Sequence, residues 1–175
     1  MSQTWRISSF NGALLACYFV PTWSVVTYRF MMSPVQGLYE QPNVSLALFL
    51  SDHLNLATMT TIRFGWLLAL AKLTVVAFFV IFLTCAARAS IRKSGGCDEP
   101  LALALGIGSL ISFISMLMAS QVGEAGALRL HATELLMMLG TAILMTIERP
   151  SSPAVEEGRE RPSLDRHYPS SSPSS

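Results

Sequence analysis

The sequence predicts an all-α integral membrane protein, a bundle of four transmembrane helices with an interfacial or re-entrant segment between the first and the second helix. Hydrophobic residues make up 51% of the chain and charged residues only 13%, about half the charged fraction of an average soluble domain. Several stretches with few or no charges reach the roughly 20 residues that a helix needs to cross a bilayer. Basic residues are unevenly distributed between the loops that join these stretches, as in membrane proteins.

The first predicted span, 7–28, contains no charged residue. Trp23 and Tyr28 stand near its end, and we expect them to anchor the helix at the membrane interface. Segment 14–17 (Leu-Leu-Ala-Cys) faintly resembles a lipoprotein cleavage site. The apolar pattern continues through Val20, however, so we expect an uncleaved helix.

The second predicted span, 66–87, is the clearest signal in the chain. It holds twenty-two residues and a single charge, Lys72, and a basic cluster from Arg88 to Lys93 follows it. Such clusters are typical of cytoplasmic loops. The third predicted span, 101–122, carries no charge over its whole length.

The fourth predicted span, 127–147, is a weaker signal. Its uncharged part is only thirteen residues long, so it reaches spanning length only if the outer turns include Arg129, His131 and Glu134. We therefore expect the polar residues of this helix to lie toward the outer side of the membrane.

The segment between the first two spans is ambiguous. The stretch 43–62 is fairly apolar but carries Asp52 and His53 at its centre. A charge at the bilayer midplane costs about 2.5–3.5 kcal/mol even on insertion scales, so we expect this stretch to lie in the interface or to re-enter from one side. A fifth crossing through 43–62 is the alternative. Asn43 also begins an Asn-Val-Ser match to the N-glycosylation pattern, which often arises by chance.

The distribution of basic residues predicts the orientation. With four crossings, and with Lys72 left out, eight basic residues lie on one side and three on the other, and the richer side is cytoplasmic by the positive-inside rule. We therefore expect a multi-pass protein of the cell (inner) membrane with both termini in the cytoplasm. The eight are Arg6, Arg88, Arg92, Lys93, Arg149, Arg159, Arg161 and Arg166, and the three are Arg29, Arg63 and Arg129.

The composition changes after Arg149. The last twenty-six residues include eight Ser and five Pro and lack the apolar area that would offset the entropy cost of ordering. We therefore predict a transmembrane helical domain over 1–149 and a disordered cytoplasmic tail over 150–175.

Two charged residues inside the predicted spans are candidates for function. Ionisable groups at membrane depth are rare and usually face the interior of a bundle. Lys72 and Glu134 are both expected in the outer half of the membrane, so they are a possible ion pair. The alternative is that each side chain extends toward the headgroups on its own.

The fourth span also carries a possible polar or metal-binding face. His131, Met138 and Met145 are separated by seven residues each, which places them on one side of a helix. Imidazole and thioether groups suit a soft metal such as Cu(I), whereas ordinary core packing of methionine is the alternative. Asp52 and His53 could assemble a His/carboxylate cluster with His131 and Glu134 on the outer side. The metal is unknown, and we expect no cofactor.

A row of small side chains follows one face of the third span. In a membrane, such a row lets another helix approach closely. It fits an internal seam and a subunit interface equally well, so we expect self-association or a larger membrane complex as partners besides the lipid bilayer. The row consists of Gly108, Ser112, Ser115 and Ala119.

No enzyme signature is present: the sequence has no GxSxG, HExxH or phosphate-binding loop motif. No basic face with interleaved aromatic residues favours nucleic acid as a partner. The leading interpretation is a non-catalytic accessory or transport-related membrane component. The alternative is a small solute or copper-type metal permease that uses the Lys72/Glu134 pair and the His131/Met138/Met145 face. A membrane-bound enzyme ranks last.

Overall fold

The computed structural model describes residues 7–88 and 97–148, and every regular element in these ranges is a helix. The predicted all-α class is therefore confirmed for this part of the chain. The basic cluster up to Lys93 falls partly, and the tail 150–175 entirely, outside the described residues. The helices are α1 (Ile7–Met32), α2 (Pro34–Leu38), α3 (Val44–Asp52), α4 (Thr58–Ala87), α6 (Asp98–Val122) and α7 (Ala125–Ile147).

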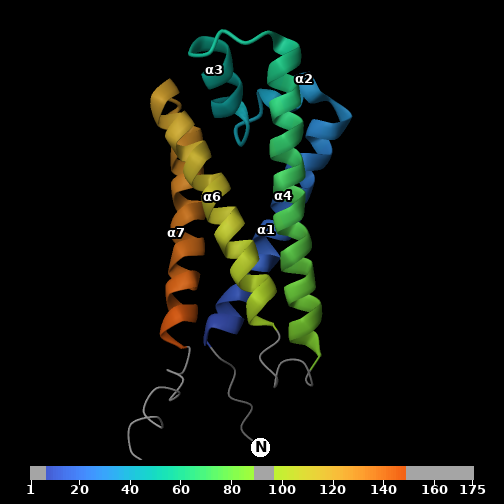
Figure 1. Cartoon of the computed structure of the whole chain (residues 1–175), viewed down its shortest axis with the longest axis vertical. Coiled ribbons are helices and arrows are strands. Elements are labelled where there is room, and N and C mark those ends of the chain that lie inside the picture. Colours follow the sequence, from blue (N-terminus) through green and yellow to red (C-terminus); the bar gives the residue numbers. More distant parts are fainter. Residues whose placement is uncertain (1–6, 89–96, 149–175) are drawn as a thin grey trace, which may run out of the picture.

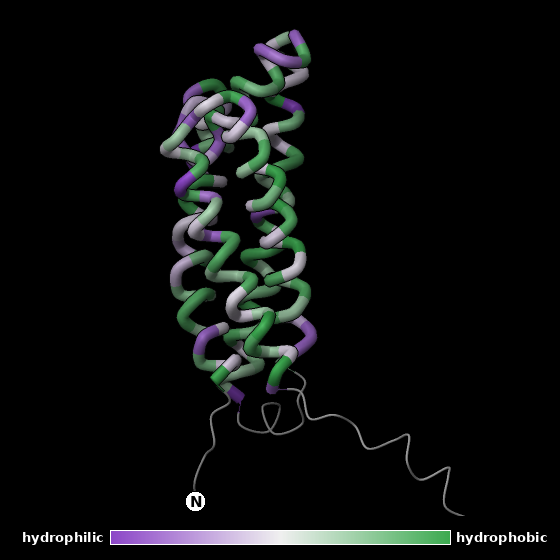
Figure 2. Tube along the Cα trace, turned by 90° about the vertical axis from the view of Figure 1, so that its left-hand side faces the viewer, coloured by the Kyte–Doolittle hydropathy of each residue, from purple (hydrophilic) through white to green (hydrophobic). Residues whose placement is uncertain are grey.

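Four of these helices, α1, α4, α6 and α7, are long and apolar enough to cross a membrane. No more than 39% of the residues in the apolar window of each helix are buried inside the molecule. The outward faces carry large apolar side chains such as Leu67, Leu110 and Ile143, and Figure 2 shows hydrophobic residues along most of the length of the bundle. Helices that are apolar on both faces need lipid as their solvent. The four helices thus indicate a membrane-embedded protein.

The long helices lie side by side and alternate in direction (Figure 1). Helix α7 packs along α6, α6 along α4, and α4 along α1, while α1 and α7 also contact each other. The short helices α2 and α3 lie at one end of this bundle, called here the α2–α3 end. The start of α1 and the end of α7 lie at the opposite end, called here the Glu148 end.

The long helices extend beyond the uncharged runs that predicted them. Helix α4 begins at Thr58, eight residues before the predicted start, and α1 continues to Met32 with Arg29 in its last turn. Helix α6 begins with Asp98 and Glu99 in its first turn. Acidic residues at a helix start and basic residues at a helix end interact favourably with the helix dipole, so charges that end an apolar run can still continue the helix.

A tight turn joins α6 to α7. Gly123 ends α6 with a φ of 76°, and the backbone N–H of Glu124 donates to the carbonyl of Ala119 at 3.0 Å. This left-handed conformation suits glycine, which has no Cβ to clash. The turn reverses the chain within a few residues, so α7 packs against α6 along its length.

Helices α2 and α3 are both too short to span a bilayer. The nine residues of α3 extend about 14 Å, less than half the hydrocarbon thickness of about 30 Å. The alternative prediction was a fifth crossing through 43–62. In the described chain no fifth helix is long enough for such a crossing. Glycines allow α2 to pack closely: a Cβ on Gly37 would lie 2.7 Å from the Cα of Phe30, and one on Gly65 would lie 2.6 Å from the Phe30 ring.

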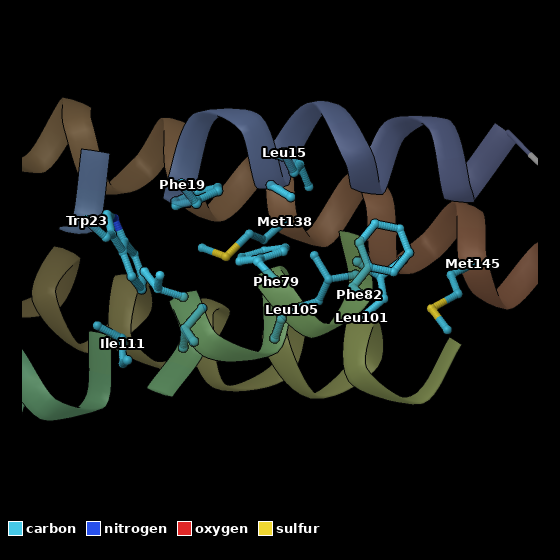
Figure 3. Packing of buried hydrophobic residues seen from close by; sticks show 14 of the residues in the cluster. Leu15, Phe19, Trp23, Phe79, Phe82, Leu101, Leu105, Ile111, Met138 and Met145 are labelled. Carbon is cyan, nitrogen blue, oxygen red and sulfur yellow. The ribbon is translucent and has the colours of Figure 1, made fainter. Parts of the chain in front are cut away.

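The main hydrophobic core lies between the four long helices (Figure 3). The rings of Phe19 on α1 and Phe79 on α4 stack with centroids 5.8 Å apart. Met138 on α7 lies beside them. Along the bundle, Trp23 lies at one end of this core and Met145 at the other. The core therefore fills the part of the bundle between Trp23 and the Glu148 end.

The close packing of α2 gives a stability test. We expect Gly37→Ala to lower the thermal stability in detergent, at a cost of about 1–3 kcal/mol, because the added methyl group meets a backbone atom that cannot move alone. The matched control is Gly106→Ala on α6, where an added Cβ meets nothing within 4 Å. The control should leave the melting temperature unchanged or slightly raised. Equal melting temperatures for the two variants would contradict this account.

Candidate functional site

Buried polar side chains from all four long helices meet beside the Trp23 end of the core. Each has at most 6% of its surface exposed, and hydrogen bonds connect them into two groups that meet at one indole ring. We call this set the polar cluster. It consists of Trp23 on α1, Asn43 just before α3, Lys72 on α4, Ser112 on α6, and His131 and Glu134 on α7.

The carboxylate of Glu134 is the centre of the first group. Its Oε1 accepts a hydrogen bond from Nε1 of Trp23 at 3.1 Å. Its Oε2 accepts one from Oγ of Ser112 at 3.3 Å and lies 3.0 Å from Nδ1 of His131. Because bonds to a charged acceptor are stronger than neutral ones, this carboxylate ties α1, α6 and α7 together.

The ammonium group of Lys72 is the centre of the second group. Its Nζ donates to Oδ1 of Asn43 at 2.9 Å and lies 5.9 Å from the centroid of the Trp23 ring. The amide nitrogen of Asn43 in turn donates to the carbonyl of Gly37 at 2.9 Å. The side chain of Lys72 is 2% exposed, so it points into the bundle rather than toward the headgroups.

Lys72 and Glu134 share this cluster without touching. Among the described residues, the ion pairs within 4.0 Å are Arg29–Glu40 and His131–Glu134. Lys72 faces the ring of Trp23, whereas Glu134 accepts the N–H of the same indole. The structure thus joins the two charged groups through Trp23, and energetic coupling between them stays a prediction.

Two buried polar atoms of the described chain have no hydrogen-bond partner. They are Nε2 of His131 and Oγ1 of Thr27. Nδ1 of His131 lies 3.0 Å from the carboxylate of Glu134, whereas Nε2 on the other side of the ring has no partner in the described chain.

The proposed metal face does not form one coordination sphere. His131, Met138 and Met145 are all buried on the inner side of α7, but each is seven residues, about 10 Å, from the next. Asp52 and His53 are exposed at the α2–α3 end and do not join them. Within the described ranges, no three His, Cys, Asp or Glu side chains are grouped so that they could hold a metal ion.

The row of small residues on α6 faces into the molecule. Gly108, Ser112, Ser115 and Ala119 are all buried. A Cβ on Gly108 would lie 2.7 Å from the sulfur of Met138, and Ser112 bonds to Glu134. Of the two interpretations of this row, the geometry favours an internal seam between α6 and α7.

Two members of the polar cluster have roles that the sequence did not indicate. Trp23 was expected at the membrane interface, but it is 3% exposed and bonds to Glu134. The expected interfacial position was wrong because the indole N–H finds a buried acceptor. Asn43, which matches a glycosylation pattern, is buried and bonded to Lys72. The sequence feature that could have indicated the role of Asn43 is its position as a polar residue directly before a short apolar segment.

A seam of polar contacts between α1 and α7 was also missed. Besides the Trp23–Glu134 bond, Asn11 donates to Oγ1 of Thr141 at 3.1 Å. At the Glu148 end, the side chain of Ser8 bonds to the carboxylate of Glu148, which also accepts the backbone N–H of Ile7 at 2.9 Å and that of Ser8 at 3.1 Å. Glu134, Thr141 and Glu148 are spaced seven residues apart, so they follow one face of α7.

Comparison with known proteins gives no relative: no protein-family model, no curated protein and no solved structure matches this chain. The defining property of the polar cluster is a buried positive and a buried negative group, held by different partners inside an apolar bundle.

A double-mutant cycle tests whether the two charges are coupled. We expect the losses of stability in Lys72→Met and Glu134→Gln to be non-additive by about 1 kcal/mol, because both groups interact with Trp23 and such couplings are modest in membrane proteins. The measurement is thermal unfolding in detergent of each single variant and of the double variant. The control cycle pairs Glu134→Gln with Arg63→Met, an exposed position on α4, and should be additive. Additivity in both cycles would show that the charges act independently.

Proposed function

We propose that this protein is a transport-related, non-catalytic membrane component that moves a small charged solute past the polar cluster. The observation that carries the proposal is the burial of Lys72 and Glu134 inside the bundle, with no ion pair between them. Ionisable groups at membrane depth are costly to bury, and they mark solute or ion pathways in membrane proteins.

The depth of Lys72 supports this proposal. It lies 14 residues after the start of α4 and 15 before its end, so it is about 20 Å from either end of the helix. Measured from Trp66, where the apolar run begins, Lys72 is six residues, about 9 Å, inside the apolar part of the helix. A purely structural helix contact at this position would be made at lower cost by apolar side chains.

The geometry of α6 gives less support to the accessory-subunit interpretation. Its row of small residues was the sequence feature that favoured a helix partner outside the chain. That row is buried within the bundle and contacts α7. Self-association or assembly with other membrane proteins therefore has to use a different surface.

We also propose an orientation in the cell (inner) membrane with both termini in the cytoplasm, supported by eight basic residues against three. The Glu148 end then faces the cytoplasm and the α2–α3 end faces outward. The segment from α2 to α3 is re-entrant in this arrangement. This is supported by Asn43, which reaches Lys72 at the middle of α4, while Asp52 and His53 are exposed at the end of the bundle.

Charge movement in proteoliposomes tests the proposed function. We expect rapid exposure to small ions (chloride, acetate, ammonium and potassium in turn) to give a transient current on a solid-supported membrane with at least one of them. Lys72→Met should abolish this current, because the buried charge that the solute meets is lost. The matched control is Arg63→Met, which removes an exposed charge from the same helix and should keep the current.

Two outcomes of this experiment would contradict the proposal. One is a current that survives in Lys72→Met at the level of the native protein. The other is the absence of a current with every ion, together with a stoichiometric protein partner that co-purifies in mild detergent. The second outcome would favour the accessory subunit instead.

Reporter fusions test the orientation. We expect fusions after Lys93 and after Arg149 to report the cytoplasm, since eight of the eleven basic residues other than Lys72 lie on that side. A fusion near Gln41 should report the outer side. An outer-side signal after Lys93 would reverse the whole arrangement, and a cytoplasmic signal near Gln41 would contradict only the position of the α2–α3 segment.

A further inference from the structure

The ammonium group of Lys72 is under-satisfied for a buried charge. It has three N–H donors, yet within the described chain its one hydrogen-bond acceptor is Oδ1 of Asn43. The remaining favourable contact is the face of Trp23, whose centroid lies 5.9 Å away. A neutral amide oxygen neutralises no charge. The group therefore keeps two spare donors, and no carboxylate of the described chain lies within 4.0 Å of it.

The negative group of the polar cluster, the carboxylate of Glu134, already has hydrogen-bond partners other than Lys72. The carboxylate of Glu134 accepts from Trp23 and Ser112 and lies 3.0 Å from the imidazole of His131. The only ion pair that Glu134 makes among the described residues is with His131. The complement that Lys72 lacks is thus a second negative charge, and the described chain does not bring one within 4.0 Å.

The hydrogen-bond acceptor of Lys72 belongs to the short segment that contains α2 and α3. Asn43 precedes α3, and its amide group also bonds to Gly37 of α2. Neither α2 nor α3 is one of the four long helices, and a cavity of about 80 Å³ between this segment and the start of α4 is lined by Leu38, Ala47 and Thr61 among others. Asn43 and Lys72 do not line this cavity, but a movement of Asn43 away from Lys72 would involve the α2–α3 segment rather than the four long helices.

We propose that Lys72 is the binding site for a small monovalent anion, which takes the position of the Asn43 side-chain oxygen. A halide or the oxygen of a carboxylate would accept the ammonium N–H groups and place a negative charge in direct contact with Lys72. This inference rests on the proposed function, because it names the charge of the transported solute. The α2–α3 segment then acts as the closure of the site, with Asn43 as the internal substitute for the anion.

Iodide is a suitable probe because it quenches tryptophan fluorescence on contact and Trp23 lies beside Lys72. The chain has three tryptophans, so the full-length protein with Trp5→Phe and Trp66→Phe reports from Trp23 alone. Sodium iodide replaces sodium sulfate at constant ionic strength in detergent. We expect saturable quenching, and we expect chloride or acetate to reverse it by competition.

Three variants in this background identify the site. Lys72→Met should abolish the saturable component. Asn43→Ala should lower the half-saturating iodide concentration about tenfold, because the internal competitor is gone. Asn43→Asp keeps the shape of the side chain but places a carboxylate at Lys72, so it should abolish iodide binding in a folded protein even if Asn43→Ala fails to fold. The control is Asn11→Ala, which breaks the asparagine contact between α1 and α7 and should leave the iodide affinity unchanged.

The inference is overturned by linear, non-saturable quenching in the parent protein, by saturable quenching that persists in Lys72→Met, or by undiminished binding in Asn43→Asp. This assay measures no flux, so its failure is distinct from failure of the proposed function. A protein that binds iodide at Lys72 but carries no current would overturn transport and leave the anion site. A protein that carries an ammonium or potassium current but binds no iodide would overturn the anion site and leave transport.

Discussion

Because the hydrocarbon interior of a membrane supplies no water, polar groups on the inner faces of these helices depend on partners within the chain. The carboxylate of Glu134 meets this requirement with donors from α1, α6 and α7. The positions of these three helices therefore depend on one another through a single side chain. Helix α4 enters the same arrangement through Lys72 and the Trp23 ring. Apolar packing alone would leave the rotation of each helix less well defined, since their lipid-facing surfaces are also apolar.

The bundle has two unequal halves along its axis. Toward the Glu148 end, the stacked rings of Phe19 and Phe79 and the side chain of Met138 fill the space between the helices. Toward the α2–α3 end, the polar cluster takes their place and the short helices cover it. A solute that reaches the cluster from the α2–α3 end meets only a short segment, whereas one from the other end meets a dense core. Any passage through the whole bundle requires the aromatic core to open as well.

The sequence was sufficient for the class of the fold, because membrane-length apolar runs and the charges between them are visible without a structure. It identified Lys72 and Glu134 as unusual for the same reason. It could not identify the partners of these residues, because Asn43 and Trp23 are 29 and 111 residues away from the groups that they bond. Helix ends were also underestimated, since an uncharged run measures the apolar part of a helix and Thr58–Gly65 of α4 precedes that part. The internal use of the small residues on α6 depends on the rotation of that helix, which spacing alone does not specify.

The contact between Glu148 and the first turn of α1 has a consequence for biosynthesis. It joins residues 140 and 141 positions apart, and the neighbouring Asn11–Thr141 bond spans 130. When α1 enters the membrane, none of these partners has been synthesised, so the N–H groups of its first turn must be solvated at the headgroup surface until α7 arrives. Contacts of such long sequence separation form late. The ring of long helices is therefore closed only when α7 is inserted. A ribosome that stalls before α7 leaves an open intermediate of three long helices. In that intermediate the N–H of Trp23 and the side chain of Ser8 lack their partners, and membrane quality control would meet these exposed groups.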